Sequence, residues 1–267
     1  MQNSQDLVKI SELTKEFKGR LGYSLQILEN LSFEIKANEF VTVLAPASAG
    51  KTTLLKIIAG IDSLTSGKIE FPFEKSNSSS DYFLSFIPSA PSSYPWYNVK
   101  QNIECFLKSS VKDPEEKQMQ IKNLLSLVGL RGYEEHYPDN RSLGFRFRIS
   151  LARALATKPK LLIIDEPFSN MDEKTRYEIY SLLREVRKNT GISILFSTSN
   201  IHEAFFLSDR IILLSARPAK IIDQIMLNLP VERDFHLLEE PYFQEIKNSV
   251  ENKFKEYGPI VKSVLTV

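Results

Sequence analysis

The sequence of 267 residues contains a single cysteine, Cys105. One cysteine cannot form an intramolecular disulfide, and it excludes a metal site built from several cysteines. Cysteine scarcity is typical of proteins from a reducing compartment. No apolar run approaches the roughly 18 to 20 residues that span a bilayer, and the first residues, 1–6, lack the layout of a signal peptide. We therefore expect a cytoplasmic protein.

The chain also lacks an excess of charge of either sign. It has 34 Lys and Arg against 33 Asp and Glu, a net charge of +1, and no long block of one sign. Proteins that bind nucleic acid through bulk electrostatics carry a marked positive excess. The balance therefore argues against a nucleic-acid partner. The chain shows no internal repeat, and its length can bury one sizeable core or two small ones.

A candidate phosphate-binding loop is the first feature that the sequence does contain. Residues 41–44 are a short run of apolar or β-branched residues, typical of a buried strand, and the apolar residues of 54–58 have helical spacing. Between them, residues 50–52 (Gly-Lys-Thr) end the pattern G-x-x-x-x-G-K-[ST], whose first glycine is replaced here by Ala45. Alanine is strained if that position needs a positive φ, and it fits if the position needs only a small side chain.

Such a loop would hold the phosphates of a nucleotide. Backbone N–H groups at the start of a helix have no intrahelical partner and attract anions. Lys51 would reach the β- and γ-phosphates, and the Thr52 hydroxyl would ligate Mg²⁺. The residues expected to bind the nucleotide here are Ala45, Pro46, Ala47, Ser48, Ala49, Gly50, Lys51, Thr52 and Thr53.

An aromatic residue, Phe17, is a candidate contact for the base of the nucleotide. Residues 7–13 and 31–35 alternate apolar and polar side chains, which predicts half-buried strands of an antiparallel layer before the strand at 41–44. Phe17 is expected in the loop between these strands. It either stacks on adenine or anchors the loop as an ordinary aromatic, and the local sequence leaves both interpretations open.

Two neighbouring carboxylates, Asp165 and Glu166, follow the apolar strand predicted at 161–164. Two carboxylates at one strand end resist ionising together unless a cation is near, and Mg²⁺ beside the phosphate loop would supply it. Asp165 would hold the metal, commonly through water, and Glu166 would polarise an attacking water. The alternative, incidental acids at an exposed strand end, is disfavoured because the apolar residues bury the strand.

The rest of the chain alternates strands with helices, which predicts an α/β fold with a mainly parallel sheet. A helical insertion interrupts it at about 88–157, where Asp113 and Pro114 start a helix that reaches about Leu130. Residues 74–81 are a polar surface loop. Further strands are expected at 66–71, 192–196 and 211–214, and further helices at 173–188, 201–207 and 241–257.

From Leu7 to Tyr257 the chain resembles the ATP-binding subunits of ABC transporters. Besides the two nucleotide motifs, the matching segments are 137–138, 146–155, 158–159, 169–172 and 207–210. The resemblance implies a P-loop NTPase (ABC ATPase) fold with a mixed sheet core and an N-terminal antiparallel β layer. It implies one ATP-binding domain, 1–267, with a helical subdomain at 88–157 and a C-terminal helical extension at 230–267.

Three segments, 94–96, 214–218 and 229–234, are most similar to importer subunits for nitrate, sulfonate and taurine. This resemblance implies that the chain binds Mg-ATP at a composite dimer interface and works with membrane permease subunits. Its place would be cytoplasmic and peripheral, on the inner face of the cell membrane. The second ATP-binding subunit would be another copy or, as we favour, a different chain. The transported substrate is not specified by this chain.

The family signature Leu-Ser-Gly-Gly-Gln aligns with residues 141–145 of this chain. Ser142 and Gly144 are retained, and the resemblance implies that they face the γ-phosphate of ATP bound by the partner subunit. Leu143, however, places a branched side chain where glycine lets the backbone approach phosphate. The signature segment is therefore expected to bind ATP weakly.

Two further family residues are replaced. Ser89 stands where the family has a glutamine that senses metal and water, and Ser199 stands where it has a histidine that contacts the γ-phosphate. His202, three positions on, is interpreted as a solvated helix residue. Since the loop and Lys51 remain, nucleotide binding should survive better than turnover.

Two functions follow from this pattern. The first is the ATPase subunit of an importer, with Glu166 and Lys51 as catalytic residues and with weakened or partner-dependent hydrolysis. The second is a catalytically inactive nucleotide-binding subunit with a regulatory or structural role. ABC proteins that work on DNA or ribosomes are disfavoured, because they carry long insertions or paired domains that this sequence lacks.

Overall fold

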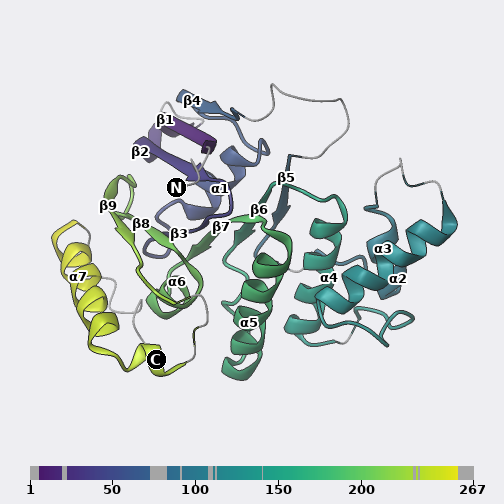
Figure 1. The fold of residues 1–267 in the computed structure, drawn as a ribbon. Helices are drawn as coiled ribbons and strands as arrows, with labels where there is room; N and C mark the ends of the chain where they lie inside the picture. Colours follow the sequence, from purple (N-terminus) through teal and green to yellow (C-terminus); the bar gives the residue numbers. More distant parts are fainter. Residues whose placement is uncertain are drawn as a thin grey trace. The chain divides into compact units, whose positions relative to one another are not determined.

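The computed structural model describes residues 6–19, 23–72, 83–90, 92–107, 111, 113–139, 141–230, 233 and 235–257. The chain forms two compact units, and Figure 1 labels their helices and strands. The first comprises Met1–Lys75 and Ile194–Val267, and the second comprises Ser76–Ser193. The polar loop predicted at 74–81 lies outside the described residues. None of the described helices is long and apolar enough to cross a membrane.

The first unit contains a three-stranded antiparallel sheet in the order β2-β1-β4. Its strands are β1 (Asp6–Lys18), β2 (Ser24–Lys36) and β4 (Ser66–Glu70). The predicted antiparallel layer is confirmed, but β1 is longer than the sequence pattern indicated. Phe17 lies within β1 opposite Leu25, so its predicted place in a loop is wrong. Register shifts between Ile10 and Glu16 break the alternation of side chains, which hid the second half of the strand.

The other sheet of this unit is built around β3 (Phe40–Leu44), a fully buried strand. It pairs in parallel with β7 (Ser193–Thr198) and β8 (Arg210–Leu214). β8 in turn pairs antiparallel with β9 (Ile221–Met226), so the sheet is mixed, as expected. β9 was not predicted from the sequence, because its residues are only partly buried and do not alternate cleanly.

Polar contacts fix the start of β3 against the start of β8. The guanidinium of Arg210 donates to both carboxylate oxygens of Glu39, at 2.7 and 2.9 Å. The N–H of Phe40 donates to the Asp209 carboxylate at 3.0 Å, and the Phe40 carbonyl accepts the N–H of Asp209 at 2.9 Å. Both members of the Glu39–Arg210 pair are buried, so removing one partner would leave an uncompensated charge. The segment 207–210, which resembles the ABC family, therefore has a structural role here.

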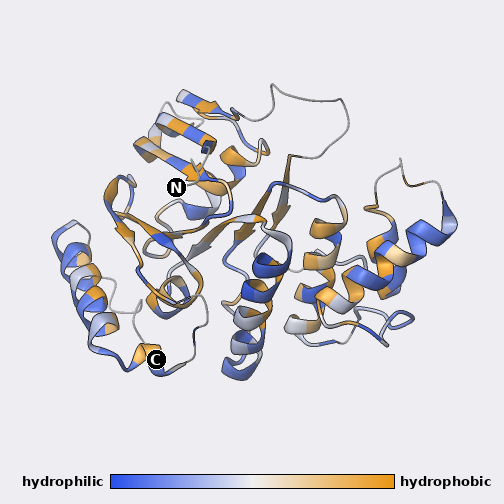
Figure 2. Ribbon diagram, viewed as in Figure 1, coloured by the Kyte–Doolittle hydropathy of each residue, from blue (hydrophilic) through white to orange (hydrophobic). Residues whose placement is uncertain are grey.

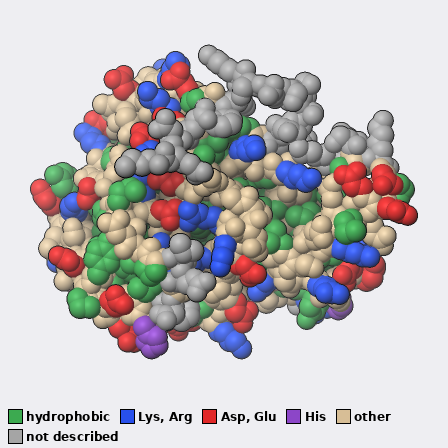
Figure 3. Space-filling view, viewed as in Figure 1, with side chains coloured by type: hydrophobic (Ala, Val, Ile, Leu, Met, Phe, Trp, Pro, Cys, Tyr) green, Lys and Arg blue, Asp and Glu red, His purple; other side chains and the backbone are tan. Residues whose placement is uncertain are grey.

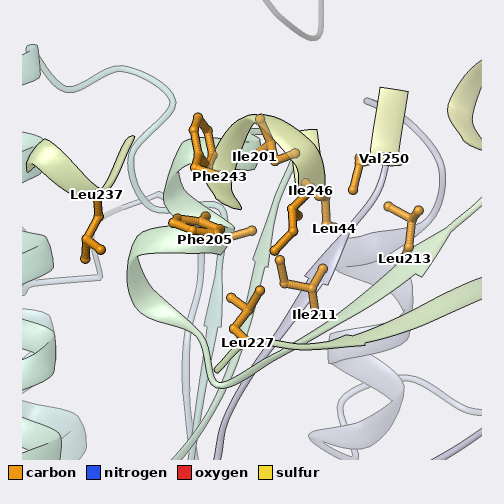
Figure 4. Packing of buried hydrophobic residues seen from close by; sticks show 11 residues of the cluster. Leu44, Ile201, Phe205, Ile211, Leu213, Leu227, Leu237, Phe243, Ile246 and Val250 are labelled. Atoms are coloured by element: carbon orange, nitrogen blue, oxygen red, sulfur yellow. The ribbon is translucent and has the colours of Figure 1, made fainter. Parts of the chain in front are cut away.

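The C-terminal helix α7 (Pro241–Tyr257) packs on α6 (Ile201–Leu207) through an apolar cluster, as Figure 4 shows. The rings of Phe205 and Phe243 meet edge to face with centroids 4.6 Å apart. Figure 2 shows hydrophilic residues along the other side of α7. The helix predicted at 241–257 is confirmed. The cluster contains Leu44, Ile201, Ala204, Phe205, Ile211, Leu213, Leu227, Leu237, Phe243, Ile246 and Val250.

The second unit contains two parallel strands, β5 (Leu84–Ile87) and β6 (Leu161–Asp165). β6 is fully buried, as predicted, whereas β5 was not predicted. The helices of this unit are α2 (Val99–Glu104), α3 (Pro114–Leu127), α4 (Leu143–Ala156) and α5 (Glu173–Thr190).

α3 begins where the sequence predicts. The Asp113 side chain accepts hydrogen bonds from the N–H groups of Glu115 and Glu116, and Pro114 occupies the first helical position. The helix ends at Leu127 and not at Leu130. The three residues beyond it form a turn through Gly129, which has a φ of 69°.

Candidate functional site

The loop of residues 45–50 joins β3 to α1 (Lys51–Ile58) in the first unit. Gly50 caps α1 with a φ of 112° and supplies no side-chain hydrogen bond. A Cβ atom at this position would lie 2.7 Å from Cγ2 of Ile27. Only glycine fits this conformation and this contact. The N–H groups of the first helical turn have no intrahelical partner, so they can bind an anion.

Ala45 fits its position without strain. It is fully buried, and it is not among the described residues with a positive φ. Its N–H donates to the carbonyl of Thr198 at 3.3 Å, which joins the end of β3 to the end of β7. The position therefore needs a small side chain and not left-handed backbone. Within the loop it is Ser48 that adopts a left-handed conformation without being glycine, with a φ of 61°.

Lys51 folds back over the loop. Its Nζ donates to the carbonyls of Ala45 (3.0 Å) and Pro46 (2.9 Å), and only 4% of the residue is exposed. Pro46 also accepts the N–H of Ala49 at 3.3 Å. The ammonium thus lies where the loop closes, held by carbonyl oxygens that phosphate oxygens could replace. Thr52 and Thr53 follow in the first turn of α1, each half-buried.

Phe17 is 44% exposed near the end of β1. The Nζ of Lys15 lies 4.7 Å from the centroid of its ring and also donates to the Asp62 carboxylate at 2.8 Å. That hydrogen bond from Lys15 holds the pKa of Asp62 below its ordinary value. Leu25, directly opposite on β2, is 51% exposed. Phe17 and Leu25 together offer an exposed apolar surface on which a base could stack.

The two carboxylates follow β6 in the second unit. Asp165 is the last residue of the strand and is 1% exposed. Glu166 is half-buried and has a φ of 36°, a left-handed conformation that costs a non-glycine residue about 1 to 3 kcal/mol. Such strain is found most often at functional sites. Among the described residues, no group of three or more His, Cys, Asp or Glu could hold a metal ion.

The segment that aligns with the signature forms the start of α4. Ser142 caps the helix, its Oγ accepting the N–H of Phe145 at 3.2 Å. Leu143 is the first helical residue and is half-buried. Gly144 is buried, and a Cβ atom there would lie 2.4 Å from Cγ2 of Thr175 on α5. Close packing of α4 against α5 thus requires Gly144, independently of any phosphate.

The two serines at family positions have different environments. Ser89 is exposed after β5, and Ser199 is half-buried between β7 and α6. His202, on α6, is not the solvated residue that the sequence indicated. Its ring centroid lies 5.0 Å from that of Phe243. Burial, assisted by the charge of Lys247, holds the pKa of His202 below its ordinary value of 6.5.

A side chain that the sequence did not indicate contacts the phosphate loop. Arg217, in the segment between β8 and β9, donates from Nη2 to the carbonyl of Ser48 at 2.7 Å. The sequence had marked 214–218 only for its similarity to importer subunits. The structure explains the contact: β3 and β8 are parallel, so the segments that follow them leave the sheet at the same edge.

Comparison with known proteins shows similarity over nearly the whole chain. Residues 28–169 match the family described as ABC transporter. The chain is 37% identical to the aliphatic sulfonates import ATP-binding protein SsuB of Bacillus cereus, covering 97% of this chain and 99% of that protein. It is 33% identical to the nitrate import ATP-binding protein NrtD of Synechocystis, covering 97% of this chain and 94% of that protein.

Solved structures show the same similarity. The ATP-binding cassette MJ0796, in a dimeric post-hydrolysis state with ADP and Pi, aligns with a TM-score of 0.70. The identity is 27%, and the alignment covers 84% of this chain and 100% of that chain. The predicted α/β fold of the P-loop NTPase type is confirmed.

Proposed function

The chain belongs to the ABC transporter family, and we propose that it is the ATP-binding, energy-coupling subunit of an importer of the nitrate, sulfonate and taurine type. Full-length similarity to import ATP-binding proteins for sulfonates and nitrate supports this proposal. The observation that carries it is the loop at residues 45–50, with Lys51 buried across its carbonyls.

In this proposal each loop residue has a definite part in binding ATP. The N–H groups at the start of α1 receive phosphate oxygens, and the Lys51 ammonium exchanges its carbonyl partners for the β- and γ-phosphates. Gly50 lets the loop turn into α1 at a point where a Cβ atom would meet Ile27. Phe17 contacts adenine with the exposed part of its ring.

Thr52 and Asp165, the residues proposed to hold Mg²⁺, each carry an oxygen donor of the kind that this ion prefers. Thr52 would supply a hydroxyl from the first turn of α1, and Asp165 a carboxylate from the end of β6. The ion would neutralise charge on the phosphates. Thr52 belongs to the first unit of the chain and Asp165 to the second.

Hydrolysis is the weaker part of the proposed activity. Glu166 would accept the proton of the attacking water, and its half-buried position after a buried strand suits that role. Ser89 and Ser199, however, lack the donors that the family places there, and Leu143 obstructs the signature. Removing one preorganised donor typically lowers a rate by about 10² to 10³, and losses within one constellation are not additive. Turnover is therefore attenuated or depends on a partner.

The proposed partners are membrane permease subunits and a second ATP-binding subunit. A different chain suits the dimer better than a second copy, since two copies would carry every replacement in both sites. Ser142 and Gly144 would then face ATP bound by the partner subunit. Lys and Arg side chains are mixed with Asp and Glu on the face shown in Figure 3, which does not favour nucleic acid. The location follows from these partners: cytoplasmic, on the inner face of the membrane.

The proposed domain organisation keeps the whole chain, 1–267, as one ATP-binding domain. Residues 88–157 form its helical subdomain, supported by α2, α3 and α4 within that range. Residues 230–267 form a C-terminal helical extension, supported by α7 and its packing on α6.

The second candidate is a nucleotide-binding subunit without turnover. The half-buried Leu143 at the start of α4 favours it, since this side chain stands at the position through which the family approaches phosphate. Both candidates bind ATP, so binding alone does not separate them.

Rates of ATP hydrolysis separate the two candidates. The purified chain should be assayed alone and with its candidate partner, in each case beside the Glu166→Gln variant. The importer ATPase predicts activity that this variant abolishes in at least one setting. If the wild type and the Glu166→Gln variant hydrolyse ATP at the same rate, both alone and with the partner, only the inactive nucleotide-binding subunit remains as a candidate. Leu143→Gly combined with Ser199→His should raise turnover if these positions limit it.

A further inference from the structure

We propose that Arg217 is a positioning residue of the phosphate loop, which holds the peptide between Ser48 and Ala49 in the orientation that binds nucleotide phosphates. The proposal rests on the proposed function, because it concerns the same loop. Its starting point is the 2.7 Å hydrogen bond from Nη2 of Arg217 to the Ser48 carbonyl. Arg217 acts through the loop and not by touching the reacting atoms.

The peptide is held from both ends. In a trans peptide the carbonyl and the N–H point in opposite directions. The Ser48 carbonyl bonds to Arg217, and the N–H of Ala49 bonds to the Pro46 carbonyl at 3.3 Å. Rotation of this peptide plane would break both hydrogen bonds.

The same arrangement reaches Lys51. The Pro46 carbonyl that accepts from Ala49 also accepts from Nζ of Lys51 at 2.9 Å. The orientation of the Ser48–Ala49 peptide therefore helps to fix the position of the Lys51 ammonium before phosphate binds. A peptide free to rotate would make both the loop amides and Lys51 less ordered, and ATP binding would then have to order them.

Ser48 explains why such a support is needed. Its φ of 61° places a non-glycine residue in the left-handed region, which is populated only when the surroundings enforce it. A guanidinium donor forms a stronger hydrogen bond to a carbonyl than a neutral donor does. The bond from Arg217 thus offsets part of the strain at the tip of the loop.

Backbone hydrogen bonds hold in place the segment that carries Arg217. Ala219 donates its N–H to the Ile27 carbonyl (2.8 Å) and accepts the N–H of Glu29 (2.9 Å), which ties the segment to β2. Lys220, on the same segment, pairs with Glu29 at 2.7 Å instead of reaching the loop. Lys220 is therefore a matched control: an exposed cation from the same segment without a bond to the phosphate loop.

The test compares three variants of the full chain: Arg217→Ala, Arg217→Lys and Lys220→Ala. Affinities for ATP and ADP are measured by titration, and thermal unfolding of the nucleotide-free proteins is measured beside them. We expect Arg217→Ala to lower the affinities for ATP and for ADP by roughly three- to tenfold, the range for one exposed hydrogen bond. Lys220→Ala should bind as the wild type does, and Arg217→Lys should recover part of the loss.

A second readout needs no nucleotide. Exchange of the Ala49 amide hydrogen, followed by NMR, should be faster in Arg217→Ala than in the wild type and unchanged in Lys220→Ala. Normal ATP binding by Arg217→Ala, or an equal loss in Lys220→Ala, would overturn the inference while leaving the proposed function intact. No ATP binding by the wild type would overturn the proposed function and the inference together.

Discussion

Gly144 packs directly against Thr175: a Cβ atom on Gly144 would lie 2.4 Å from Cγ2 of that threonine. The glycine belongs to the segment aligned with the family signature, and Thr175 lies on the first turn of α5. The hydroxyl of Thr175 donates to the Asp172 carboxylate at 2.6 Å, so the side chain is held in place. The retained glycine is therefore explained by helix packing, whatever becomes of the signature in ATP binding.

Gly144→Ala should lower the free energy of unfolding by about 1 to 3 kcal/mol, the usual cost of overpacking a closely packed interface. Thr175→Ser removes Cγ2 but keeps the hydroxyl that bonds Asp172. The double variant should regain most of the loss, which urea unfolding measures. If Thr175→Ser gives no recovery in the double variant, the contact with Cγ2 is not the cause.

Substitutions of Gly50 and Ala45, at the two ends of the phosphate loop, should differ in their effect on ATP affinity. Gly50→Ala introduces strain at a φ of 112° and a contact with Ile27, so it should cost at least about 2 kcal/mol of stability and most of the ATP affinity. Ala45→Gly should lose about 0.5 to 1 kcal/mol of stability through added flexibility of the unfolded chain, and should gain no affinity. Tighter ATP binding by Ala45→Gly would contradict the conclusion that alanine fits.

Lys51→Ala should weaken ATP binding by about 10- to 100-fold, because charge-assisted hydrogen bonds contribute about 1.5 to 3 kcal/mol. Lys56→Ala is the control, since this lysine is exposed in the last turn of the same helix. Isothermal titration compares the two. Equal affinities in both variants would exclude Lys51 as a phosphate ligand, and thermal unfolding shows that each variant is folded.

Acid should destabilise the protein partly through His202. The pKa of His202 is lowered in the folded chain, so above its ordinary value of 6.5 the residue is neutral in both states. As the pH falls below 6.5 the unfolded chain takes up the proton first, and stability is lost, by at most about 1.4 kcal/mol per pH unit for one proton.

Urea unfolding at pH 7.5 and at pH 5.5 tests this expectation. His202→Gln should show a smaller loss of stability between the two pH values than the wild type. Lys247→Met removes a charge that helps to lower this pKa and should reduce the loss in the same direction. A His202→Gln variant as acid-sensitive as the wild type would assign the effect to other groups.

The sequence predicted the elements whose periodicity is regular. The buried strands β3, β6 and β8 are continuous apolar runs, and α3 has its cap and proline in place. It failed where the local pattern is irregular. Register shifts hid the second half of β1, and β5 and β9 are too short or too exposed to show a period.

Among the candidate residues, Lys51 and Ala45 could be placed because one short loop joins them. His202 and Arg217 could not. The burial of His202 depends on Phe243, and the contact of Arg217 depends on Ser48, and both partners are far away in the sequence. Contacts of this kind arise from the parallel order of the strands and the return of the C-terminal helix, which no local pattern encodes.

The packing of Leu44 has a consequence for how the protein is made. Leu44 immediately precedes the phosphate loop, and it shares one apolar cluster with Phe243, Ile246 and Val250 of α7 (Figure 4). During synthesis the N-terminal strands leave the ribosome long before that helix. The end of β3 therefore cannot reach its native packing until almost the whole chain has been translated, so the phosphate loop gains its full support last, although its residues are made among the first.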